Sequence, residues 1–186
     1  SQGITAKYSK IDTYHMAACA IDTAVRNAVS CGGNINRLAL LDNFCWCSSD
    51  DPERLGQLKA AAKACYDYSL IYKTPFISGK DSMFNDFKGY DENNNPIKIS
   101  VLPTLLVSSI GVIDDYKKTV SLDAKFVGDL VYVLGITKKE MGASEYFELV
   151  GEDQKKEYIG NDVPKVNGEE AYKLYLAFNQ AVEEQI

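Results

Sequence analysis

The sequence predicts an α+β fold in which helices and strands follow one another in mixed order. Two long stretches, 13–30 and 52–72, carry apolar residues at helical spacing. Three shorter stretches, 37–42, 97–101 and 103–113, are apolar runs with the length of strands. This order favours antiparallel or mixed pairing of the strands.

Both long helices carry signals at their ends. Asp12 or the threonine after it can cap the helix at 13–30, and Gly32-Gly33 can close it. The helix at 52–72 has Pro52 in its first turn, where a proline is tolerated because its missing N–H has no partner there. The apolar residues of each helix lie on one face, which predicts packing against a sheet.

The predicted strands differ in their surroundings. The strand at 37–42 ends in two polar residues and is followed by an apolar loop at 44–46. A polar, turn-rich stretch at 85–96 predicts the exposed tip of a hairpin. The stretch at 103–113 is apolar on both faces and contains small residues, which predicts a central strand covered on both sides.

A second unit is predicted to begin after a boundary at 114–128. A strand is expected over 130–136, and Gly142 opens a turn into a short helix. The last helix is predicted over 167–184, because an asparagine and a glutamate three residues apart at its start have the spacing of a capping box.

Composition excludes several classes of function. The 186 residues include 20 basic and 26 acidic side chains, a net charge of −6, so nucleic acid is not an expected partner. No apolar run is long enough to cross a membrane, and no signal peptide is visible. Five cysteines are an odd number for a disulfide scaffold, which predicts reduced thiols and a cytoplasmic protein.

The chain has one histidine, His15, which argues against a Ser-His or Cys-His catalytic pair and against a structural zinc site. His15 is expected near a helix start as a surface or capping side chain. Phe44 and Trp46 could wall a pocket, but aromatic residues of this kind are more often part of a core or an interface.

The segment 78–83, Ser-Gly-Lys-Asp-Ser-Met, is the most informative part of the chain. It follows a short apolar run and is expected to form a turn that offers backbone N–H groups, an ammonium and a hydroxyl to phosphate oxygens. It is not a Walker A loop, because Thr74 stands where that motif needs a glycine. The sequence therefore predicts a phosphate-binding loop outside the common nucleotide-binding patterns.

Seven segments together resemble the second half of the phosphoribosylformylglycinamidine synthase family, the large amidotransferases of purine biosynthesis. The resemblance spans nearly the whole chain, and GKDSM with LLDN upstream is its most specific part. The wider superfamily includes aminoimidazole ribonucleotide (AIR) synthetase, selenophosphate synthetase and hydrogenase maturation proteins. The segments are AIDTAVRN (20–27), RLALLDNFCW (37–46), TPFISGKDSMFN (74–85), LPTLLVSSIGVIDD (102–115), GDLVYVLG (128–135), GASEY (142–146) and VPKVNGEEAYKLY (163–175).

This resemblance implies a fold of two domains. Residues 1–121 would form an AIR synthase N-terminal-like domain, lacking its first strands, with a mixed sheet and helices on one side. That sheet would build a barrel with a sister domain, or pair with a second copy of the chain. Residues 122–186 would be the opening part of an AIR synthase C-terminal-like α+β domain.

The resemblance also implies a reaction. ATP would phosphorylate the amide oxygen of formylglycinamide ribonucleotide, and ammonia derived from glutamine would displace the phosphate to give the amidine. Mg²⁺ and cationic side chains would stabilise the charge of the transferred phosphoryl group. Expected partners are the two substrates, the sister domain and a glutaminase, and the isolated chain is expected to be inactive.

Within this resemblance, Lys80 is the expected catalytic residue, contacting phosphate oxygens. Gly79, Asp81 and Ser82 would bind substrate or phosphate beside it, and Asn43 would hold a polar group of the substrate. The competing interpretation of Lys80 is an exposed lysine paired with Asp81, an arrangement worth about 0–1 kcal/mol.

Two residues are expected at a nucleotide and metal site. Asp42 at a strand end suits Mg²⁺, which prefers oxygen ligands, although an Asp-Asn pair also starts turns. Asn27 would share a metal–nucleotide site with a glutamate one helical turn earlier, but Thr23 stands at that position. Asn27 and Arg26 could equally form a solvated face.

Two alternatives stay open from the sequence. The chain could be a structural pseudo-domain that holds nucleotide at a domain interface without turnover, which Thr23 favours. It could also be part of a related ATP-dependent synthetase of the AIR or selenophosphate type.

Overall fold

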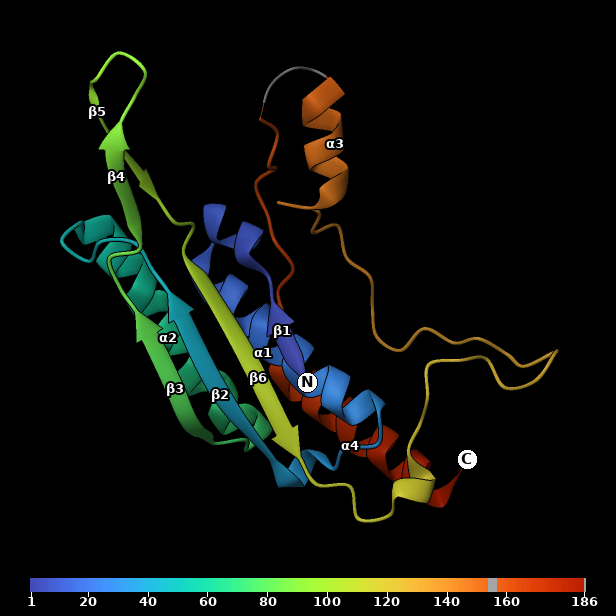
Figure 1. The fold of residues 1–186 in the computed structure, drawn as a ribbon. Helices are drawn as coiled ribbons and strands as arrows, with labels where there is room; N and C mark the ends of the chain where they lie inside the picture. Colours follow the sequence, from blue (N-terminus) through green and yellow to red (C-terminus); the bar gives the residue numbers. More distant parts are fainter. Residues whose placement is uncertain (154–156, 186) are drawn as a thin grey trace.

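The computed structural model describes residues 1–153 and 157–185 and shows a four-stranded sheet backed by helices (Figure 1). The strand order of the sheet is β1-β6-β2-β3, and a separate hairpin joins β4 to β5 and projects beyond the sheet. The strands are β1 (Gln2–Ile4), β2 (Leu38–Cys45), β3 (Phe76–Ser82), β4 (Asp86–Tyr90), β5 (Pro96–Ser100) and β6 (Thr104–Gly111). The helices are α1 (Thr13–Ser30), α2 (Pro52–Tyr72), α3 (Glu145–Asp153) and α4 (Gly168–Glu184), with short 3₁₀ helices η1 (Ala6–Lys10), η2 (Ile35–Arg37) and η3 (Tyr116–Lys118).

The predicted helices are confirmed, because their end signals act as expected. The Asp12 carboxylate accepts a hydrogen bond of 2.9 Å from the backbone N–H of His15, which fixes the start of α1. At the end of α1 the chain turns through Gly32, whose φ of 97° is open to glycine. The Asn167 side chain accepts from the N–H of Glu170 at 3.3 Å and begins α4.

The sheet is mixed, as predicted. β6 is antiparallel to both β1 and β2, whereas β2 and β3 run parallel. β6 is therefore central, but the prediction that both of its faces are covered is wrong. Leu105 and Val107 are fully buried beneath the helices, while Ile110 on the other face is 60% exposed, since no described element lies over that face.

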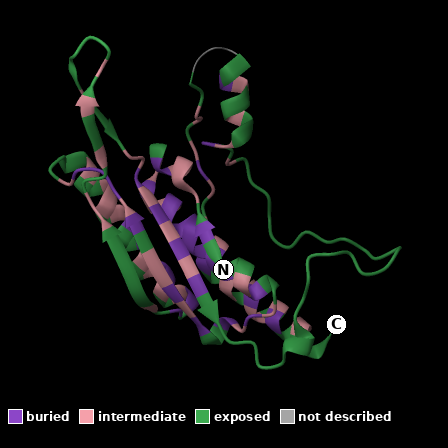
Figure 2. Ribbon diagram, in the orientation of Figure 1, coloured by how far each residue is buried: buried purple, intermediate pink, exposed green. Residues whose placement is uncertain are grey.

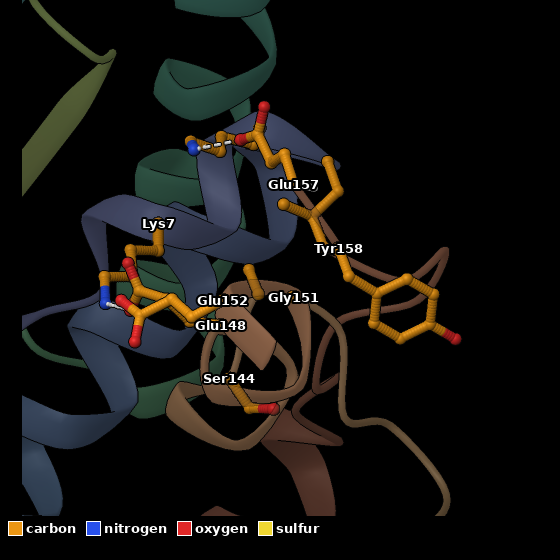
Figure 3. A pocket seen from close by; sticks show the side chains of 10 residues that line it. Lys7, Ser144, Glu148, Gly151, Glu152, Glu157 and Tyr158 are labelled. Carbon is orange, nitrogen blue, oxygen red and sulfur yellow. Dashed lines mark hydrogen bonds and ion pairs between the residues drawn. The ribbon is translucent and has the colours of Figure 1, made fainter. Parts of the chain in front are cut away.

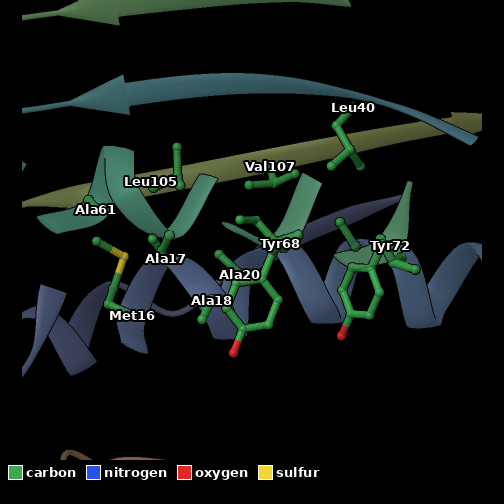
Figure 4. Close-up of a cluster of buried hydrophobic side chains, with 14 of the residues drawn as sticks. Met16, Ala17, Ala18, Ala20, Leu40, Ala61, Tyr68, Tyr72, Leu105 and Val107 are labelled. Carbon is green, nitrogen blue, oxygen red and sulfur yellow. The ribbon is translucent and has the colours of Figure 1, made fainter. Parts of the chain in front are cut away.

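Small side chains let α1 approach the sheet closely. Ala17, Ala20 and Ala24 are fully buried, and Gly3 of β1 sits against the backbone of α1. Figure 4 shows the buried side chains of α1 and α2 gathered under those of the sheet, with the hydroxyls of Tyr68 and Tyr72 pointing away from the sheet.

α4 forms a third layer against α1 and α2. Polar contacts attach it: the Tyr68 hydroxyl donates to the carbonyl oxygen of Val166 at 2.6 Å. The buried Asn179 accepts from the N–H of Ile35 at 2.9 Å and donates to the carbonyl oxygen of Gly33 at 2.9 Å. The last helix is thus part of the same packed body as the sheet.

Two sequence predictions are corrected here. Residues 130–136 form no strand, since they have no partner strand among the described residues, and their side chains are exposed (Figure 2). The apolar loop expected from residue 44 begins later, since β2 continues through Cys45. Trp46 is fully buried and its indole N–H donates to the carbonyl oxygen of Arg54 at 3.0 Å, which confirms a core role.

None of the helices in the described parts of the chain has the length and apolar character needed to span a membrane.

The contact between β1 and α1 predicts the effect of two glycine substitutions. A Cβ at Gly3 would lie 2.0 Å from the carbonyl oxygen of Ala20, so Gly3→Ala is expected to lower the free energy of unfolding by at least about 1–3 kcal/mol. Gly56→Ala is the matched control, since nothing lies within 4 Å of its Cβ position on α2 and alanine favours a helix by about 0.5–1 kcal/mol. Urea unfolding of both variants measures the difference, and equal effects would contradict the close packing of β1 on α1.

Candidate active site at the β2–β3 edge

The parallel pairing of β2 with β3 brings most of the predicted site residues together. Asp42 lies beside Gly79, and Asn43 lies beside Lys80. The prediction of a turn at this segment is wrong, because residues 76–82 form an extended strand. A strand paired along β2 cannot wrap its successive N–H groups around one anion.

The alternation of a strand then divides these residues between the two faces of the sheet. Asp42 and Asp81 face α2 and line a cavity there. Asn43 and Lys80 lie on the opposite, open face, where the Lys80 ammonium donates to the Ser82 hydroxyl. Ion pairs between Lys80 and Asp81 are absent from the described residues, which agrees with their opposite directions.

The cavity between β2, β3 and α2 has a volume of about 560 Å³. Partial burial raises the pKa of the Asp42 carboxyl, its own backbone N–H opposes this rise, and the nearby charge of Asp81 adds to it. Burial, together with the charge of Asp42, raises the pKa of the Cys65 thiol to about 12. The cavity therefore holds two carboxyl groups and a neutral thiol. Its lining residues are Asp42, Phe44, Leu58, Ala62, Cys65, Phe76, Asp81 and Met83.

Gly79 makes room for the Asp42 carboxylate. A Cβ at this position would lie 2.1 Å from Oδ1 of Asp42, so any side chain would displace the carboxylate. The sequence suggested a different role for this glycine, an open backbone at a turn. Its actual role depends on the register between two strands, which no local pattern reveals.

The chemistry of Asp42 and Asp81 fits a magnesium ion. Mg²⁺ is usually held by one or two carboxylates together with water and the phosphates of a substrate. Clusters of three or more histidine, cysteine or acidic side chains are not found in the described residues, so the protein would supply two carboxylates at most.

Asn27 does not join this site. It lies on α1, which packs on β1 and β6 at the far side of the sheet from β3. Its amide donates to the carbonyl oxygen of Gln2 at 3.2 Å, and the hydroxyl of Thr23 faces the Arg26 guanidinium at 3.4 Å. A helix face with no free carboxylate and a cation already in place does not fit a metal ion.

A buried cluster beside Asn27 was not expected. Asp22 is 4% exposed, and one of its carboxylate oxygens accepts from the hydroxyls of Tyr72 and Tyr175, each at 2.6 Å. The other oxygen accepts from Nη1 of Arg26 at 3.1 Å. Burial and the Asp22 charge raise the pKa of both tyrosines, so they stay protonated donors. The sequence offered one signal, an arginine four residues after an aspartate in an apolar stripe.

Another cavity, of about 450 Å³, lies between η1 and α3 and contains none of the predicted residues (Figure 3). Its two lysines are already paired. Lys7 contacts Glu145 at 2.7 Å and also Glu148, and Lys10 contacts Glu157 at 2.5 Å. These ion pairs attach α3 and residue 157 to η1.

The position of Asp42 predicts a pH dependence of stability. A carboxyl with a raised pKa holds its proton more tightly in the folded state, so its contribution is favourable below the ordinary pKa and is lost as the pH rises through the raised value. Asp42→Asn, which cannot ionise, should therefore raise the urea midpoint at pH 7 and do so less at pH 4. Asp50→Asn, at an exposed loop residue, is the control and should show no such difference. An Asp42→Asn effect that does not depend on pH would contradict the assignment.

Comparison with known proteins supports this fold. The chain is 29% identical over 180 residues to phosphoribosylformylglycinamidine synthase subunit PurL of Methanocaldococcus jannaschii, which covers 96% of this chain and 23% of that protein. It is 33% identical over 144 residues to the same subunit of Thermococcus sibiricus, covering 77% of this chain and 18% of that protein. The chain thus spans less than a quarter of the curated relatives it matches. No protein-family model matches it.

Solved structures agree on the fold. The match to T. maritima PurL complexed with FGAR covers all of this chain and 27% of that chain, with a TM-score of 0.59 and 15% identity. The match to T. maritima PurL complexed with ATP covers 63% of this chain and 18% of that chain, with a TM-score of 0.51 and 24% identity. The α+β fold predicted from the sequence is confirmed. Over most of its length, this chain is similar to one segment of the phosphoribosylformylglycinamidine synthase subunit PurL.

Proposed function

We propose that this chain is part of an ATP-dependent ligase, a phosphoribosylformylglycinamidine synthase. The observation that carries the proposal is the similarity to the M. jannaschii subunit along 96% of the chain. The complete enzyme would convert formylglycinamide ribonucleotide, ATP and ammonia from glutamine to the amidine, ADP and phosphate. Because the chain spans 23% of that relative, the isolated chain would be inactive, and a glutaminase would supply the ammonia.

The open face of the sheet supports a role for a second domain. Ile4 is 52% and Ile110 60% exposed on this face. Exposed apolar side chains gathered on one face are typical of an interaction surface. In this proposal the sheet of a sister domain, or a second copy of the chain, covers it. Lys80 and Asn43 lie on the same face, so substrate would bind between the two sheets.

Lys80 would supply charge to the reaction. The step transfers a phosphoryl group to an amide oxygen, and such reactions depend on positioning and on cationic groups that stabilise the transferred charge. The ammonium of Lys80, oriented by the Ser82 hydroxyl, would contact phosphate oxygens in the closed interface. Asn43 would then hold a polar group of the ribonucleotide beside it.

Asp42, with Asp81, would hold magnesium on the other face of the same strands. When bound, the ion would neutralise charge on the phosphates of ATP. Because β3 is an edge strand of the sheet, the phosphates would have to reach from one face to the other around this edge. This proposal assigns the nucleotide to the β2–β3 edge, and it leaves Asn27 outside the metal site.

We also propose the domain division at residue 121. Residues 122–136 carry large apolar side chains that are strongly exposed, with Val127 109% and Val131 93% accessible relative to a reference residue. Such a segment gains stability when further strands cover it. It would therefore open a second α+β domain, whose helix α4 packs back on the first domain through Asn179. The alternatives of a related synthetase and of an inactive pseudo-domain are not favoured, since the relatives reported above are all PurL subunits.

A chimera tests the proposal. This chain replaces the matched segment of the M. jannaschii PurL subunit, and formation of the amidine from ribonucleotide, ATP and ammonia is measured. The chimera is expected to be active, and Lys80→Ala is expected to lower kcat by more than about tenfold, because a cation at the transferred phosphoryl group is lost.

Lys88→Ala, at an exposed lysine of the β4–β5 hairpin, is the matched control and should leave the rate unchanged. Circular dichroism would verify that each variant is folded. Steady-state constants unaffected by Lys80→Ala would contradict the role of Lys80, and a folded but inactive parent chimera would contradict the proposed function.

A further inference from the structure

Arg26 is held in a fixed direction by a buried support. Its Nη1 lies 3.1 Å from Oδ2 of Asp22, and the other oxygen of Asp22 is occupied by Tyr72 and Tyr175. The side chain of Asp22 is 6% exposed, while that of Arg26 is 55% exposed. Nη1 is therefore anchored inside the protein and Nη2 lies 3.4 Å from the Thr23 hydroxyl, while the rest of the half-exposed guanidinium is open to solvent.

These N–H groups reach a cavity that the β2–β3 site does not use. It has a volume of about 620 Å³ and lies between α1, α4 and residues 133–140. Its size is that of a pocket for a small molecule. Apolar side chains make up most of the wall, including Val29, Leu134, Leu174 and Phe178. A ligand would thus meet a mainly apolar surface with an oriented cation at one side.

The other charged groups of the cavity are mostly engaged. The Lys165 ammonium pairs with Asp162 at 2.9 Å, and Glu140 accepts from the backbone N–H of Lys165 at 3.2 Å. Lys138 and Glu170 complete the charged lining, one of each sign. Acidic and basic side chains are thus equal in number in the lining, and Arg26 is the cation whose position is fixed by buried partners.

The side chains beside Arg26 on α1 are not free to coordinate a metal ion that would balance the charge of an anion. The hydroxyl of Thr23 faces the Arg26 guanidinium, the Asn27 amide is bonded to the backbone of β1, and the Asp22 carboxylate already has three donors. A guanidinium matches the geometry of a phosphate or a carboxylate without help from a cation.

We propose that Arg26 is the anion-binding residue of a metal-independent site in this cavity, which takes an organic molecule with a phosphate or carboxylate on an apolar or aromatic body. Asp22, Tyr72 and Tyr175 are positioning residues that orient the guanidinium. The site rests on its own geometry and does not depend on the ligase reaction proposed above.

Calorimetric titration of the 186-residue chain tests the site. The probes are ADP and naphthalene-2-carboxylate, each in EDTA and in Mg²⁺, with adenosine and pyrophosphate as the separate halves of ADP. At least one of the two complete probes is expected to bind in EDTA, with a Kd that Mg²⁺ does not lower. If ADP is the probe that binds, adenosine and pyrophosphate should each bind more weakly than ADP. The probe that binds more tightly, ADP or naphthalene-2-carboxylate, shows whether the site prefers a phosphate or a carboxylate.

Arg26→Gln should weaken this binding by at least about tenfold, the loss expected when a charge-assisted hydrogen bond to the ligand is removed. Arg37→Gln is the matched control, an exposed arginine that contacts Asp114 away from the cavity. Tyr175→Phe removes one donor from Asp22 and should weaken binding severalfold, with thermal unfolding measured to establish that the variant is folded. Binding only in the presence of Mg²⁺, equal binding by Arg26→Gln, or no binding of either probe would each overturn the proposal.

Discussion

One buried carboxylate, Asp22, joins the three long helices. A charge removed from water is costly unless hydrogen bonds and an opposite charge compensate for it. Two tyrosines and an arginine provide that compensation here, one tyrosine from α2 and one from α4. Because the other face of α1 packs on the sheet through alanines, this cluster, together with the hydrogen bonds of Asn179, fixes α4 relative to the strands.

The sheet organises the candidate active site by separating its residues. Neighbours in sequence such as Lys80 and Asp81 point to opposite faces, so one strand serves two environments. The face toward α2 offers the partly buried carboxylate of Asp42 and the exposed carboxylate of Asp81, and the open face offers an ammonium, an amide and a hydroxyl. In the proposed function, a second surface covers the open face and completes the site.

Much of the fold could be predicted from sequence because its signals are local. Caps and apolar spacing lie within a few residues of one another, and the bounds of α1 and α2 agree with the structure. The β3 segment was mistaken for a turn because Gly, Lys, Asp and Ser are typical of turns, and only its parallel partner shows otherwise. The Asp22 cluster could not be predicted from the sequence, since its tyrosines are 50 and 153 residues away along the chain.

The place of β3 at the edge of the sheet has a consequence for assembly. An edge strand leaves one row of backbone groups unpaired, and a flat apolar edge invites a foreign strand to join and aggregation to follow. Ile77 is 61% exposed on this strand, but charged Lys80 and Asp81 follow it. Charges at an edge make the approach of another chain unfavourable. Lys80 and Asp81, which the proposed function assigns to ligand binding, therefore also oppose the pairing of another strand with β3.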